Sequence, residues 1–191
     1  MSRGLLTTPF AVVTGLGLVS SSYFFFGNLG MVTCGVIKMT TSARDRQRLD
    51  INPDRAVALW ADMFEAGLRN FAPTSIVTVL THLTAGLMVK KYSLSSNKEL
   101  SSQLFLASSL ISLTILPYTA GVMMANIKNL LATRDRILAA RAHGEVTVLQ
   151  ESEGDDVLQR IQAWKVQNLG RMAIGLTSWT LGNAAIALLL V

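Results

Sequence analysis

Four long stretches of the chain contain no Asp, Glu, Lys or Arg. They are residues 4–37, 70–89, 100–127 and 172–191, with 34, 20, 28 and 20 residues. A helix of about 20 predominantly apolar residues spans a bilayer core of about 30 Å. The pattern therefore predicts one integral membrane domain over residues 1–191, with four transmembrane helices over about 9–37, 70–89, 100–127 and 172–191.

A soluble helical bundle is the alternative interpretation of these stretches. Half of the residues are hydrophobic and 15% are charged. Four such helices in one small soluble chain would leave the bundle no polar outer face. The expected fold is therefore all-α, a four-transmembrane-helix bundle with amphipathic interfacial segments.

Two positions have the residue types that begin helices. Thr8 followed by Pro9 predicts the start of a first helix that runs to about Met39. Asn52-Pro53-Asp54 predicts a second start, with Asp54 near the positive end of the helix dipole. Trp60, Phe64 and Leu68 then recur at four-residue spacing, which predicts an amphipathic helix leading into the second span.

The connections between the later spans differ in length. Lys90 to Glu99 is a short polar turn, which predicts that the second and third spans are antiparallel neighbours. Residues 128–156 are expected to form a soluble loop with a weakly ordered acidic patch, Glu151 to Asp156. Asp155 or Asp156 is then expected to begin another amphipathic helix. One face of that helix aligns Val157, Ile161, Trp164 and Asn168.

Charge and cysteine content narrow the classes of partner. The formal net charge is +5, but the basic residues lie mostly beside acidic ones in the connecting segments and at the helix ends. This placement favours lipid headgroups over nucleic acid. Cys34 is the only cysteine, so an intrachain disulfide and a multi-cysteine metal site are both excluded.

We expect a multi-pass membrane protein. The sequence does not identify the organelle, although an endomembrane is favoured, and a homo-oligomer is compatible with the sequence.

His82 is a titratable residue inside a predicted span. On a helix it shares one face with Ser75 and Thr78. An imidazole can act as a base near neutral pH, and ionisable residues inside membranes are candidates for function. The alternative is a neutral histidine that joins helices by a hydrogen bond. A metal site is not expected, because His143 lies in a loop and the spans contain no carboxylate.

Several polar residues are predicted near the ends of the spans. Asn28, Tyr118, Asn168 and Arg171 are candidates to line a polar-mouthed cavity that is open to amphipathic molecules. Close packing between helices is the alternative explanation for the small and polar residues of these spans.

Three short motifs resemble a known family. They are Phe24-Phe25-Phe26-Gly27-Asn28, then Pro117-Tyr118-Thr119 followed by Met123-Met124 and Leu130, and finally Trp164 with Asn168 and Arg171. Together they look like the small four-helix membrane proteins that include the fungal anthrone oxygenases. Many members of that family follow the methionine with Pro-Thr-Asn, where this chain has Ala125-Asn126-Ile127.

The resemblance implies a cofactor-independent oxygenase that converts an anthrone to an anthraquinone with molecular oxygen. On this hypothesis His82 is the base, and Arg171 and Asn168 stabilise the substrate anion. Residues Trp60, Tyr118, Trp164 and Asn28 then bind the flat aromatic substrate, and no metal or other cofactor is expected. For Arg171 the alternative is a membrane-boundary anchor, and for the two tryptophans it is an interfacial belt. A non-catalytic scaffold or accessory protein and a small-metabolite transporter are the rival functions.

Overall fold

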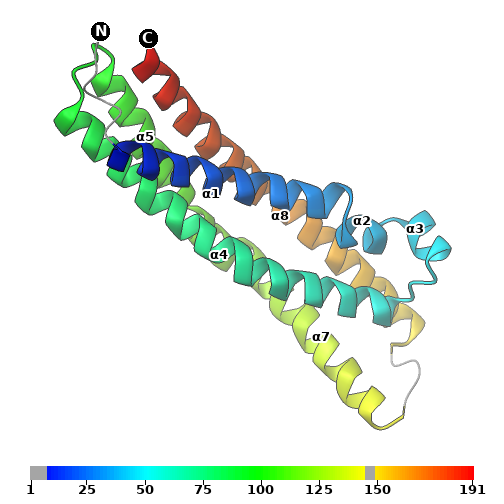
Figure 1. Ribbon diagram of the computed structural model, residues 1–191. Coiled ribbons are helices and arrows are strands. Elements are labelled where there is room, and N and C mark those ends of the chain that lie inside the picture. The colour runs from blue at the N-terminus through cyan, green and yellow to red at the C-terminus, as the bar shows by residue number, and fades with distance from the viewer. Residues whose placement is uncertain (1–7, 145–148) are drawn as a thin grey trace. The chain divides into compact units, whose positions relative to one another are not determined.

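The computed structural model describes residues 8–144 and 149–191. The described residues are 90% helical and contain no strand, which confirms the predicted all-α class. The main helices are α1 (Thr8–Thr33), α4 (Pro53–Tyr92), α5 (Lys98–Leu113), α7 (Met124–Ala142) and α8 (Glu151–Leu190). Short segments connect them: α2 (Val36–Thr41), α3 (Ala43–Arg48), α6 (Ile115–Tyr118) and the π-helix η1 (Thr119–Met123). Figure 1 shows the course of the chain.

Four helical stretches among the described residues are long and apolar enough to cross a membrane. They are Thr8–Thr41, Pro53–Tyr92, Lys98–Ala142 and Glu151–Leu190. Large apolar side chains project outward from them, for example Val19, Leu80 and Leu110, each more than half exposed. An outward apolar surface on helices of this length is what lipid tails require. The chain is a multi-pass integral membrane protein.

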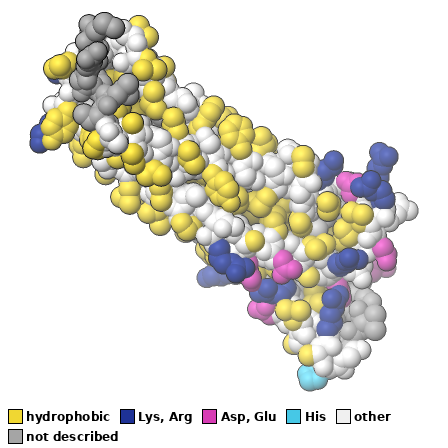
Figure 2. Space-filling model, in the orientation of Figure 1, with side chains coloured by type: hydrophobic (Ala, Val, Ile, Leu, Met, Phe, Trp, Pro, Cys, Tyr) yellow, Lys and Arg dark blue, Asp and Glu magenta, His cyan; other side chains and the backbone are white. Residues whose placement is uncertain are grey.

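The helices contribute to two compact units. Unit 1 contains Met1–Gly27, Asn70–Pro117 and Arg171–Val191, and unit 2 contains Asn28–Arg69 and Tyr118–Gly170. On the face that Figure 2 shows, Lys, Arg, Asp and Glu side chains gather over unit 2, whereas hydrophobic and uncharged side chains cover most of unit 1.

In unit 1, α4 and α5 are antiparallel neighbours, as the short turn between them predicted. The hydroxyl of Ser102 donates to the Gly86 carbonyl at 2.9 Å, and that of Ser109 donates to the Val79 carbonyl at 2.9 Å. Residue numbers therefore rise along α5 as they fall along α4. Serine hydroxyls and Gly86 permit this close approach, which is typical of helix packing in membranes.

Unit 2 has an apolar core made from several helices. Trp60 of α4 and Trp164 of α8 are fully buried in it. Other buried members come from α2, α4, α7 and α8: Ile37, Val57, Ile127, Leu130 and Ile161. Val57, Leu130 and Ile161 come from segments that the sequence placed outside the membrane spans, whereas Ile37 and Ile127 lie at the ends of predicted spans.

The observed helix bounds correct several predictions. The first helix was expected to reach Met39, but α1 ends at Thr33, and α2 begins separately at Val36. The second predicted start is confirmed, because α4 begins at Pro53, where the Asn52 side chain accepts a hydrogen bond from the Arg55 amide at 2.9 Å. The first described residue, Thr8, already lies in α1, so the start predicted there stays a prediction.

The region expected as a loop over 128–156 is largely helical. Helix α7 continues to Ala142, because Leu130 and Ile137 are buried in the unit 2 core. Helix α8 begins at Glu151 and not at Asp155 or Asp156. Near this start, the Glu153 carboxylate accepts a hydrogen bond from the Gln150 amide at 3.3 Å, which ties the acidic segment into the first turn.

The amphipathic faces are partly as predicted. Val157, Ile161, Trp164 and Asn168 are all buried along one face of α8, which confirms that alignment. On α4 the prediction is wrong at Leu68, which is exposed, while Trp60 is buried.

The third predicted span is also interrupted, since η1 follows Pro117 and separates α6 from α7. A proline removes one backbone donor, and π-helical turns inside helices often lie at functional sites.

Candidate active site

His82 of α4 lies at the centre of a hydrogen-bond network in unit 1. Its Nδ1 atom is 2.7 Å from the Ser108 hydroxyl of α5. Ser108 Oγ is also 2.8 Å from Ser178 Oγ of α8, which in turn is 2.5 Å from Ser112 Oγ. All four side chains are buried, with at most 2% exposed. One imidazole and three hydroxyls therefore form a continuous chain across three helices.

Two glycines make room for the His82 ring. A Cβ atom on Gly17 of α1 would lie 2.7 Å from ring atom Cδ2, and one on Gly182 of α8 would lie 3.0 Å from Cε1. The same two Cβ positions are 2.9 and 3.1 Å from Nε2. Nε2 is buried and has no hydrogen-bond partner among the described residues. The backbones of α1 and α8 thus crowd Nε2, while Nδ1 faces the hydroxyl chain.

A small cavity lies at the other end of this hydroxyl chain. It has a volume of about 10 Å³, which is about the space that one water molecule needs. Ser112 and Ser178 line it, together with Ser21, Phe24, Ser75, Thr78, Ile115 and Gly175. Five of these eight residues carry a hydroxyl group. His82, Ser75 and Thr78 were predicted to share a face, and all three are buried within unit 1.

Arg171 belongs to an aromatic cluster of unit 1. Its guanidinium carbon lies 5.8 Å from the centre of the Phe24 ring, in a cation–π contact. Phe24 meets Phe71 edge to face with ring centres 6.1 Å apart, and Tyr23 lies 5.5 Å from the same ring. Arg171 is half-buried and engaged with Phe24, which favours a role inside unit 1 over that of a simple lipid anchor.

The predicted tryptophans pack together inside unit 2. Trp60 and Trp164 meet edge to face with ring centres 5.9 Å apart, and Phe64 stacks on Trp60 at 5.3 Å. Their burial at 0% and 1% exposure contradicts the interfacial-belt alternative. Neither indole N–H has a hydrogen-bond partner among the described residues.

Asn168 lies one helical turn after Trp164 on the buried face of α8. Its side chain is fully buried, and neither Nδ2 nor Oδ1 has a partner among the described residues. An unmet buried polar group costs about 1–3 kcal/mol. Together with the two indoles, unit 2 therefore holds several buried polar atoms that a ligand with oxygen atoms could satisfy. Asn28 is also fully buried in unit 2.

The Tyr118 side chain is hydrogen-bonded to α8. Its hydroxyl donates to the Gln167 carbonyl at 2.9 Å, and a Cβ on Gly170 would collide with that hydroxyl. The Gln167 side chain donates to the Val122 carbonyl at 3.1 Å, in the π-helical turn η1. The Val122 carbonyl of this irregular turn thus has a hydrogen-bond donor on the neighbouring helix α8.

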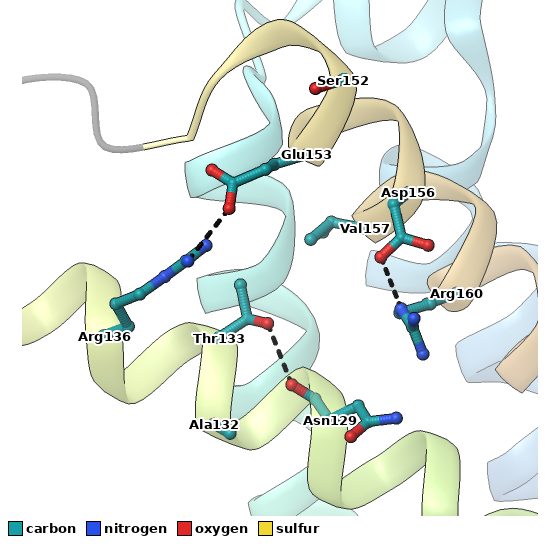
Figure 3. Close-up of a pocket in the computed structure, with 9 residues that line it drawn as sticks. All are labelled: Asn129, Ala132, Thr133, Arg136, Ser152, Glu153, Asp156, Val157 and Arg160. Atoms are coloured by element: carbon teal, nitrogen blue, oxygen red, sulfur yellow. Dashed lines mark hydrogen bonds and ion pairs between the residues drawn. The ribbon is translucent and has the colours of Figure 1, made fainter.

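A polar pocket between α7 and α8 in unit 2 was not predicted (Figure 3). It has a volume of about 530 Å³. Arg136 bonds Glu153 at 3.0 Å, and Arg160 bonds Asp156 at 2.6 Å. The hydrogen bond from Arg136, and a second one from the Gln150 amide, lower the pKa of Glu153. These charges neutralise one another, so the pocket presents no net attraction for an ion of either sign.

The predicted site residues divide between the two units. His82 and Arg171 belong to unit 1, whereas Asn28, Trp60, Tyr118, Trp164 and Asn168 belong to unit 2. Within unit 2 the two tryptophans are in contact with each other, and their role as substrate walls stays a prediction. Sequence reasoning assigned Ser108, Ser112 and Ser178 to packing and did not connect them to His82. The four-residue spacing of Ser108 and Ser112 on one face of α5 was the available signal, while nothing in the sequence marked Ser178, Gly17 or Gly182 as neighbours of His82.

No group of three or more His, Cys, Asp or Glu side chains within residues 8–144 and 149–191 could hold a metal ion. That the reaction needs neither a metal nor another cofactor remains a prediction. These features define a multi-pass helical membrane protein with a buried histidine network and an aromatic interior.

The family model of the anthrone oxygenases matches residues 60–181. The matched region contains His82, Tyr118, Asn168 and Arg171, and Asn28 lies outside it. The chain belongs to the anthrone oxygenase family. No curated protein and no solved structure matches it.

Proposed function

We propose that this protein is a cofactor-independent oxygenase that oxidises an anthrone-type aromatic polyketide to a quinone with molecular oxygen. Membership of the anthrone oxygenase family supports an oxygenase role. The reaction converts one CH₂ group and one O₂ molecule into one carbonyl group and one water molecule. No further reductant is required, because the substrate supplies all the electrons.

The chemistry asks three things of the protein. A base must remove a proton from the CH₂ group, and hydrogen-bond donors must stabilise the resulting anion, whose charge lies largely on oxygen. A dry aromatic pocket must hold the flat ring system while the anion passes an electron to O₂. His82 is the proposed base.

The unpartnered amide of Asn168 is the observation that carries the proposal. A fully buried amide with no partner is costly, and a bound anion with acceptor oxygens would satisfy its Nδ2 donor, while Oδ1 needs a hydrogen-bond donor. The indole N–H groups of Trp60 and Trp164 lack partners in the same unit and could donate in the same way. Their rings supply apolar walls, with Tyr118 and Asn28 as further proposed contacts. Arg171 is a second proposed anion stabiliser.

The test is oxygen uptake by the purified protein in detergent, supplied with emodin anthrone, with quinone formation followed in parallel. Flavin-free buffer with a metal chelator tests the cofactor claim. We expect uptake matched by quinone, and a fall of about 10²–10³ in kcat for Asn168→Leu, the usual loss when one anion donor is removed. Asn129→Leu is the matched control, because Asn129 is exposed in the same unit.

Three outcomes would contradict the proposal. No uptake above protein-free detergent would remove the oxygenase function for this substrate class. Activity that disappears with the chelator would overturn cofactor independence. Tight binding of the anthrone without any oxygen uptake would favour a transporter.

A further inference from the structure

We propose that unit 1 contains a proton relay that runs from His82 through Ser108, Ser178 and Ser112 to a cavity that binds one water molecule. The inference rests on the proposed function only for the use of the relay in catalysis. The relay itself is carried by the geometry of the four side chains and by the cavity at their end.

The distances allow a proton to pass along the whole chain. Three consecutive separations are 2.7, 2.8 and 2.5 Å, all within the range of direct hydrogen bonds. Ser108 has one hydroxyl hydrogen and three acceptors within reach: His82 Nδ1, Ser178 Oγ and the Ser178 carbonyl at 2.7 Å. The hydrogen can therefore point toward or away from the imidazole, which a relay requires in order to reset.

The cavity has room for one water molecule, and five of its lining residues carry hydroxyl groups. Ser21, Ser75 and Thr78 each donate their hydroxyl hydrogen to a carbonyl of their own helix, at 2.8, 3.0 and 2.9 Å. Their oxygen lone pairs remain as acceptors. One water molecule there can donate to Ser112 and to one of these three oxygens, within the two to four partners that buried water needs.

The transfer balances as a proton movement without any change of oxidation state. Ser108 gives its proton to His82 Nδ1 and receives one from Ser178. Ser178 receives a proton from Ser112, and Ser112 receives one from the water. One N–H bond forms and one O–H bond of the water breaks. The hydroxide that remains regains a proton from the next water molecule or acid that reaches the cavity.

The crowding of Nε2 explains why His82 would act through the relay. Gly17 and Gly182 bring two helix backbones close to Nε2, so Nδ1 is the nitrogen that leads toward the cavity. In an oxygenase of the proposed kind, His82 would then accept the substrate proton indirectly. Ser108, Ser178 and Ser112 are positioning and relay residues in this account.

The test measures exchange with deuterated water of the proton on His82 Nδ1, the ring nitrogen that the relay reaches. The full-length protein in detergent micelles is labelled with ¹⁵N-histidine, and His143, the other histidine, is assigned with His143→Gln. Ser178→Ala and Ser112→Ala should slow exchange at His82 by about tenfold or more. Ser109→Ala is the matched control, because Ser109 also joins α5 to α4 by a buried hydroxyl but lies outside the chain.

The sign of the change separates a relay from a structural role. Loss of a structural hydrogen bond loosens the helices and speeds exchange, whereas loss of a relay slows it. Exchange in Ser178→Ala that equals or exceeds that of Ser109→Ala would overturn the proposal. If the wild-type protein consumes no oxygen with an anthrone, the proposed function fails, but the exchange measurement still decides the relay.

Discussion

The imidazole of His82 occupies the space that a side chain at Gly17 would fill. A Cβ there would lie 2.7 Å from the ring, and the Thr81 hydroxyl would be 2.9 Å away. Contacts this short force the ring or the helix to move. The position of His82 in α4 thus depends on a glycine of α1, more than sixty residues earlier in the chain.

Gly17→Ala should therefore lower stability by about 1–3 kcal/mol, the usual cost of overpacking a core. Gly15→Ala is the matched control on the same helix, because nothing lies within 4 Å of its added Cβ. That variant should be neutral or more stable by up to about 1 kcal/mol. Thermal unfolding in detergent, followed by circular dichroism, compares them. Equal melting temperatures would mean that the His82 ring is not tightly packed against Gly17.

His82→Ala should abolish oxygen-dependent quinone formation without preventing membrane insertion. His82→Asn is the sharper variant, because its amide can replace the hydrogen bond to Ser108 but cannot act as a base. We expect His82→Asn to fold and to lack turnover. Activity near that of the wild type in this variant would leave His82 with a helix-joining role only.

Asn168→Leu should stabilise the ligand-free protein. The substitution removes two buried polar atoms that have no partner among the described residues, each of which costs about 1–3 kcal/mol. Asn126→Leu is the contrasting variant, because the Asn126 amide donates to the Arg160 carbonyl at 2.9 Å. Melting temperatures should rise for the first variant and fall for the second. A fall for both would show that Asn168 is satisfied within the protein, and would remove the main support for an anion site there.

Gly170→Ala should displace the Tyr118 hydroxyl from the Gln167 carbonyl. The added Cβ collides with that hydroxyl, so we expect a loss of about 1–3 kcal/mol and a change in tyrosine fluorescence. Gly121→Ala serves as the control, since its Cβ would meet no atom within 4 Å. If Tyr118 also binds the substrate, KM should rise in Gly170→Ala and not in the control. An unchanged KM would assign Tyr118 to packing alone.

Sequence patterns predicted the parts of this protein that depend on local chemistry. The uncharged stretches predicted all four apolar helices, because a membrane span needs only length and apolar character. Asn52-Pro53-Asp54 marked a helix start correctly, since capping is decided within one turn. The family resemblance that the sequence suggested was also correct.

Tertiary structure decided what depends on contacts between distant segments. The loop expected over 128–156 is largely helical, because burial of Leu130 and Ile137 stabilises a segment whose own sequence is polar. The partners of His82 could not be predicted either. The rotation and register of three helices decide which serine faces the imidazole. The space that Gly17 and Gly182 leave for the ring exists only once those helices have packed. The sequence determined that the chain enters the membrane as helices, and their packing determined which polar groups meet inside it.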